Sequence, residues 1–166
     1  MNCIKKGLIL LIGMICSSLC FAEQISFQII QHNNSVEKVT EEALVVEDAL
    51  LSTFFDKGYI VTNSEALLSN SVKNDCNLWK TGMEEAINGS SDYFVQIILH
   101  FTEKDNGSVM QKNMILEKVD YSFSLTENGN IKSEGTLICN LQVCDSSDLT
   151  IISSSIIDEI VKVLNA

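Results

Sequence analysis

The chain has 166 residues, of which 46% are hydrophobic, and its 22 acidic residues outnumber its 11 basic ones, all lysine, to give a formal net charge of −11 at pH 7. This balance argues against nucleic acid and anionic membrane surfaces as partners, because both require a basic footprint on the protein. The absence of arginine also argues against bidentate binding of phosphate or carboxylate groups.

Residues 1–22 have the layout of a secretory signal peptide. Lys5 and Lys6 precede an apolar stretch at residues 7–15, and Cys20-Phe21-Ala22 forms a small-x-small cleavage site. We predict cleavage after Ala22, no membrane insertion afterwards, and a single domain over residues 23–166 with a net charge of −13, from nine lysines against 22 acidic residues. The alternative is a lipid anchor at Cys20, although Leu19 is bulky where bacterial lipoproteins favour Gly or Ala.

The first half of this domain reads as alternating strands and helices. Residues 24–30, QISFQII, alternate as a strand does, with apolar residues on one side. Over residues 35–58 apolar positions recur every three or four residues, the period of a helix face, and Gly58 is suited to end that helix. Residues 59–63, YIVTN, predict a short second strand.

The next segment predicts three smaller elements. Residues 65–70, EALLSN, are expected to form a brief helical turn, and residues 72–77, VKNDCN, a loop that carries Cys76. Residues 78–89 are expected to form a second helix that ends at Asn88-Gly89 and is weakened by Gly82.

The second half is rich in strands. Strands are predicted at residues 92–102, 118–126 and 131–139, with polar turns at 103–108 and at 127–130, ENGN, where Asn-Gly suits a tight hairpin. A last helix is predicted over residues 146–165. The resulting order, β-α-β-α-β-β-β-α, predicts an α+β domain: a mixed, mostly antiparallel sheet of about five strands with helices packed on one face.

The strand predicted at residues 92–102 carries apolar residues on both of its faces. Tyr93, Val95, Ile97, Leu99 and Phe101 line one face, as expected above a core, while Phe94 and Ile98 interrupt the other, polar face. We interpret Phe94 and Ile98, joined by Ile138 from a neighbouring strand, as a contact site for another protein. The alternative is that residues 70–80, which include Trp79, fold over this spot.

Three cysteines remain after the predicted cleavage: Cys76, Cys139 and Cys144. An exported protein lies in an oxidising compartment, where disulfides persist. Cys139 and Cys144 are separated by a short connection whose ends can meet the spacing of a bridge, so they are the disulfide candidates.

Two phrases resemble those of a known group of domains. Residues 49–65, ALLSTFFDKGYIVTNSE, end a helix at Gly and enter a strand, and residues 91–97, Ser-Asp-Tyr-Phe-Val-Gln-Ile, open the central strand after the second helix. Together with the order of elements, they resemble the small periplasmic domain shared by the TolB amino-terminal domain, the lipoprotein activators of penicillin-binding proteins and the curli-secretion lipoprotein. The resemblance implies a bacterial periplasmic protein that acts through protein contacts.

No catalytic motif is found. Cys76 with His32 or His100 is the one conceivable nucleophile and base set, and no catalytic, cofactor or metal residues are predicted. We therefore expect an exported, non-enzymatic protein of the cell envelope that binds another protein as an accessory or assembly factor. The alternatives are a thiol-dependent enzyme centred on Cys76 and a carrier of a small ligand.

Overall fold

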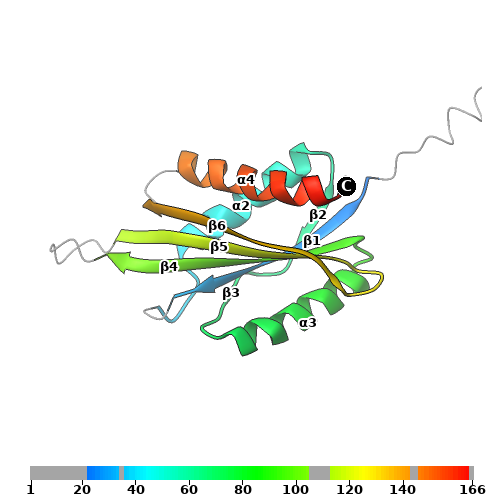
Figure 1. The fold of residues 1–166 in the computed structure, drawn as a ribbon, viewed down its shortest axis with the longest axis horizontal. Coiled ribbons are helices and arrows are strands. Elements are labelled where there is room, and N and C mark those ends of the chain that lie inside the picture. The colour runs from blue at the N-terminus through cyan, green and yellow to red at the C-terminus, as the bar shows by residue number, and fades with distance from the viewer. Residues whose placement is uncertain (1–21, 34–35, 105–112, 143–145, 165–166) are drawn as a thin grey trace, which may run out of the picture.

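The computed structural model describes residues 22–33, 36–104, 113–142 and 146–164. The predicted leader, except for Ala22, and Cys144 lie outside these ranges. Figure 1 shows one central sheet with helices on both sides of it.

The sheet is mixed, as predicted. Its strand order is β2-β1-β4-β5-β6, with β3 also paired to β1. β1 pairs in parallel with β2, β3 and β4, and the two longest pairings, β4 with β5 and β5 with β6, are antiparallel. The strands are β1 (Gln24–His32), β2 (Ile60–Asn63), β3 (Leu67–Leu68), β4 (Tyr93–Lys104), β5 (Asn113–Leu125) and β6 (Ile131–Gln142).

The helices are α2 (Glu41–Asp56), α3 (Val72–Asn88) and α4 (Ser146–Leu164). α2 and α4 pack side by side over one face of the sheet, and α3 lies on the opposite face (Figure 1). The α+β class with a mixed sheet is therefore confirmed. The prediction that all helices lie on one face is wrong, because α3 has an apolar stripe of its own and buries it on the other side.

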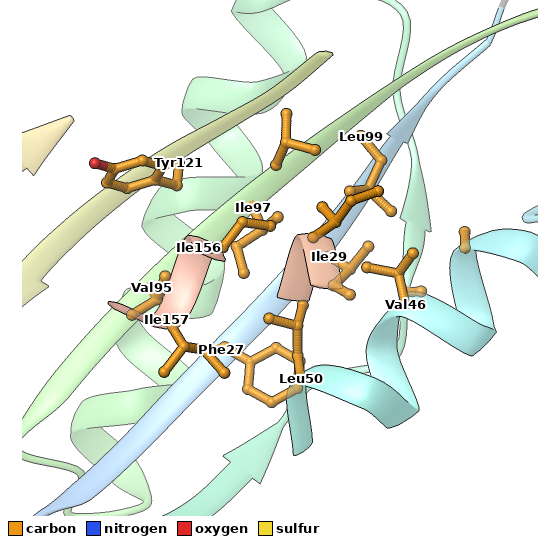
Figure 2. Packing of buried hydrophobic residues seen from close by; sticks show 14 of the residues in the cluster. Phe27, Ile29, Val46, Leu50, Val95, Ile97, Leu99, Tyr121, Ile156 and Ile157 are labelled. Atoms are coloured by element: carbon orange, nitrogen blue, oxygen red, sulfur yellow. The ribbon is translucent and has the colours of Figure 1, made fainter. Parts of the chain in front are cut away.

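The main core lies between the sheet and the pair α2 and α4. Figure 2 shows Phe27 and Ile29 of β1 and Val95, Ile97 and Leu99 of β4 meeting side chains of both helices. From α2 come Val46 and Leu50, and from α4 come Ile156 and Ile157. The alternation of the strands and the helical spacing of the apolar residues thus bury one face of each element.

Three local predictions differ from the structure. α2 begins at Glu41 rather than near residue 35, and residues 65–70 contain strand β3 instead of a helical turn. Residues 72–77 belong to α3 and not to a loop, because the Ser71 hydroxyl accepts a hydrogen bond of 3.3 Å from the Asn74 N–H and so caps the helix.

Candidate functional site: a groove between α3 and the open sheet

Phe94 decides how α3 sits on the sheet. Its side chain is fully buried and packs against Met83 and Ala86, and the centroids of the Phe94 and Trp79 rings lie 4.9 Å apart. Trp79, Met83 and Ala86 follow one another at spacings of four and three, so they share one face of α3. Phe94 is therefore a packing residue beneath a helix and not part of an exposed contact site.

Gly82 allows α3 to approach this closely. A Cβ atom at position 82 would lie 2.5 Å from Cζ and 2.9 Å from Cε2 of Phe94, well inside van der Waals contact. Buried polar groups hold the same interface nearer the start of the helix, where Gln96 Nε2 donates to the carbonyl oxygen of Asp75 at 3.3 Å and to Gln28 Oε1 at 3.2 Å. The helix is thus fixed by both apolar and polar contacts.

α3 packs on β1 and β4, and beside it the same face of β5 and β6 borders an open hollow of about 590 Å³. We call this hollow the α3 groove. Its floor includes Ile98, Asp120 and Ser122, its helix wall includes Val72, Cys76, Trp79 and Lys80, and its far rim includes Ile131 and Glu134. The volume lies within the range of about 300–1,000 Å³ in which protein sites hold ligands.

The predicted contact residues separate in the structure. Phe94 is buried under α3, Ile98 is half-buried on the groove floor, and Ile138 lies outside the groove on β6 with 71% of its surface exposed. The predicted alternative for residues 70–80 holds for Phe94, since Trp79 covers it, but the covering segment is a helix. Two of the three residues, Ile98 and Ile138, therefore remain accessible.

One end of the groove carries a histidine–carboxylate pair that joins the helix to the sheet. His32 Nε2 of β1 lies 3.0 Å from Asp75 Oδ1 of α3, and both side chains are largely buried. Asp75 lies on the sheet-facing side of α3, where an isolated carboxylate would be costly to bury. The pair thus gives Asp75 a partner and ties the first turns of α3 to β1.

A second pair, on β4 and β5, lies next to the first. His100 Nε2 is 2.7 Å from Asp120 Oδ2, which also accepts from Lys118 Nζ at 2.9 Å, and Thr136 Oγ1 donates to Asp120 Oδ1 at 2.6 Å. Burial would raise the pKa of Asp120, but the hydrogen bonds from Thr136 and Lys118 outweigh it and lower the pKa. Asp120 is therefore an ionised, fully bonded group within the floor.

The two histidines touch. Their ring centroids lie 4.7 Å apart in an edge-to-face arrangement. Burial lowers the pKa of His100, and the nearby Lys118 ammonium lowers it further, against the opposing effect of Asp120. The lowered pKa favours the neutral form of His100 at pH 7, and both imidazoles are oriented by their hydrogen bonds to carboxylates.

Cys76 lies on the groove wall, and its side chain is exposed. Among the described residues no hydrogen bond joins Cys76 to either histidine, and Asp75 and Asp120 occupy the histidine Nε2 atoms. Cys76, His32 and His100 all line the same groove. The disulfide candidate Cys139 is partly buried, burial raises its pKa, and its predicted partner Cys144 lies outside the described residues.

No group of three or more His, Cys, Asp or Glu side chains in the described part of the chain is arranged to hold a metal ion. No helix within the described ranges is long and apolar enough to cross a membrane.

Sequence reasoning missed the two histidine–aspartate pairs. His32 and Asp75 are 43 positions apart in the chain, and His100 and Asp120 are joined only by strand pairing. One signal was present for Asp75, because it lies seven residues before Gly82 and four before Trp79, on the face that packs on the sheet. A carboxylate on a packed helix face indicates a buried partner.

Three solved structures that resemble this chain share little of its sequence. XCC0632 from Xanthomonas campestris has a TM-score of 0.50 at 8% identity, over 86% of this chain and 86% of its own. Lipoprotein GNA1162 from Neisseria meningitidis has a TM-score of 0.49 at 10% identity, over 85% and 99%. The C-terminal domain of LpoB from Salmonella enterica has a TM-score of 0.41 at 13% identity, over 78% and 91%.

The resemblance stated from the sequence is confirmed as a likeness of fold. No curated protein matches the chain. A family model with the description "Uncharacterised protein" matches residues 24–140.

Proposed function

We propose that this chain, which belongs to the family whose model matches residues 24–140, is an exported, non-enzymatic protein of the cell envelope. It binds another protein through the α3 groove. The observation that carries the proposal is the groove itself, an open hollow of about 590 Å³ beside a helix that covers only part of the sheet. The fold, shared with small periplasmic domains, and the predicted signal peptide support the envelope location.

The groove has the mixed character of a protein contact site. Half-buried Ile98 lies on its floor, and exposed Val72 and Ile131 flank it with 75% and 47% of their surfaces accessible. Lys80 on the helix wall and Glu134 on the far rim supply charges at opposite sides. Apolar groups at the centre with polar groups around them are typical of surfaces that bind another protein.

The use of the polar groups supports a non-enzymatic role. Asp75 and Asp120, two of the carboxylates of the groove, are each hydrogen-bonded to a histidine, and Asp120 also to Lys118 and Thr136. These bonds join α3 to β1 and join the strands of the groove floor to one another, which is a structural use of these side chains.

Site-specific photocrosslinking in intact cells tests the proposal. A photoreactive residue replaces Ile98 in the groove or, as a matched control, Ile151 on α4, which is 65% exposed on the other side of the sheet. We expect one protein to be trapped from position 98 and not from position 151. The trapped protein, once purified, should change the fluorescence of Trp79, the single tryptophan of the chain and part of the groove wall.

Two results would contradict the proposal. Equal trapping from positions 98 and 151 would mean that the groove has no preferred occupant. A purified partner that binds without any effect on Trp79 fluorescence would place its site elsewhere on the molecule.

A small-ligand carrier is the second candidate, because the groove also has the volume of a ligand site. It predicts that the exported protein carries an extractable small molecule, which mass spectrometry of the purified native protein would detect.

A further inference from the structure

β6 forms one border of the sheet, and no described strand pairs with its outer edge. It is 12 residues long, whereas β2 at the opposite border has four. A long edge strand presents a row of unpaired backbone N–H and C=O groups, which a further strand can pair with. The two borders of this sheet therefore differ in their capacity to accept another chain.

Part of β6 lacks the usual protection of an edge strand. Natural edges are blocked by charges, proline, β-bulges or short length. Residues 135–141, GTLICNL, contain no charged residue, and the whole chain contains no proline. The pairing of β6 with β5 shifts register between Ile138 and Leu141, so the uncharged edge with regular pairing is residues 135–138.

The side chains of β6 provide contacts on both faces of the sheet. Ile138 projects on the face that carries the α3 groove, paired with Lys118 of β5, and is 71% exposed. Leu137 and Cys139 project on the other face, partly buried against the main core. An added strand would therefore cover Ile138 with one set of its side chains and extend the core with the other.

Charge decides between a second copy of this chain and a different protein. The whole chain has a net charge of −11, and the predicted domain at residues 23–166 has −13, so two such molecules repel each other. A segment from a neutral or basic protein meets no such repulsion. The uncharged edge next to an acidic body fits an extended segment whose residues are aliphatic at alternate positions and whose parent protein is not acidic.

We propose that the partner binds by β-strand addition: an extended, uncharged segment with alternating aliphatic residues pairs with β6 along residues 135–138. The inference rests on the proposed partner binding and specifies its form. Main-chain hydrogen bonds to the β6 edge supply affinity, and the side-chain position next to Ile138 supplies preference for an aliphatic residue.

The test uses the partner trapped through the photoreactive residue at position 98. Ile138→Lys places a charge where the added strand would cover it, and a covered lysine without a partner is costly. Ile151→Lys makes the same change at an exposed isoleucine away from the edge. We expect Ile138→Lys to lower the yield of the trapped complex by about tenfold or more, which corresponds to at least about 1.4 kcal/mol, and Ile151→Lys to leave it unchanged.

Amide hydrogen exchange on the purified complex separates strand addition from side-chain contact. Strand addition protects alternate amides of residues 135–138, because every second N–H of a regular edge strand points outward. Trapping at position 98 that is insensitive to Ile138→Lys, or sensitive without alternate amide protection, would overturn strand addition and leave the groove proposal standing. Failure to trap any protein at position 98 would instead contradict the groove proposal. In that case a photoreactive residue at position 138 replaces the one at position 98. A partner trapped there that protects alternate amides of β6 would still support strand addition.

Discussion

At the scale of the residue, Phe94 and Phe55 show that environment and not residue type decides the effect of a substitution. Phe94 is fully buried between β4 and α3, while Phe55 on α2 is 72% exposed. We predict that Phe94→Ala lowers the free energy of unfolding by about 3–5 kcal/mol, the usual cost of emptying a buried aromatic site. Phe55→Ala should change it by no more than about 0.5 kcal/mol. Urea denaturation of the two variants measures the difference, and equal midpoints would contradict the packing described for Phe94.

His100 gives stability a dependence on pH near neutrality. Burial, followed by the Lys118 charge, lowers its pKa in the folded protein below the usual 6.5. The unfolded chain therefore takes up a proton first as the pH falls, and stability decreases from about the unfolded pKa down to the folded one. Asp120, whose pKa is lowered by its hydrogen bonds, loses its contribution only below its ordinary value of 3.8, so the two effects occupy separate windows.

His100→Gln checks this assignment. The variant keeps His32, the other histidine of the chain, and removes the group with the lowered pKa. We expect its unfolding free energy to fall less than that of the natural chain between pH 7.5 and pH 5.5, as measured by urea denaturation at each pH. A slope that is the same for both proteins would show that His100 is not responsible.

At the scale of the element, the close contact between α3 and β4 depends on Gly82. Replacing glycine by alanine within a helix usually stabilises it by up to about 1 kcal/mol. Here the added Cβ would meet the buried Phe94 ring at 2.5 Å, and overpacking costs about 1–3 kcal/mol. We predict a net loss of stability for Gly82→Ala, whereas Thr81→Ala at the adjacent exposed position should be nearly neutral. A Gly82→Ala variant with a higher urea midpoint than the natural chain would contradict the close fit.

The same helix shows where sequence reasoning succeeded and failed. The helix predicted over residues 78–89 agrees with the second part of α3. Its first two turns were predicted as a loop, because Asn74, Asp75 and Asn77 are weak helix formers. The Ser71 cap and the bonds of Asp75 to His32 and of its carbonyl to Gln96 hold this part in the helix, and the last two are tertiary contacts that no local pattern encodes.

At the scale of the whole molecule, the order of elements was sufficient to predict the class of fold and the mixed sheet. The central position of β4 in the sheet also agrees with the presence of buried apolar residues on both of its faces. The side of the sheet on which α3 packs could not be predicted, because two apolar residues on a mostly polar face, Phe94 and Ile98, are equally consistent with a covering helix and with an exposed site. Because the groove lies beside α3, its position could not be predicted from the sequence either.

The unprotected edge of β6 and the acidity of the whole molecule act against each other, and this yields a prediction that needs no partner. At about 0.01 M salt, charge repulsion extends about 30 Å and keeps copies of the chain apart; at about 1 M salt it extends about 3 Å. We expect self-association, measured by light scattering at pH 7, to appear as the salt concentration rises.

If that association proceeds through β6, Ile138→Lys suppresses it because the new charge blocks the edge, whereas Ile151→Lys changes the net charge by the same amount on α4 and has a smaller effect. Each variant lowers the net negative charge by one, which by itself weakens repulsion and favours association. Equal effects of the two variants would therefore contradict a contact through β6. Stronger suppression by Ile138→Lys would place the contact on β6, the strand where we expect the partner to pair. Salt would then screen the repulsion between copies and allow a second copy to pair with the β6 edge in place of a different protein.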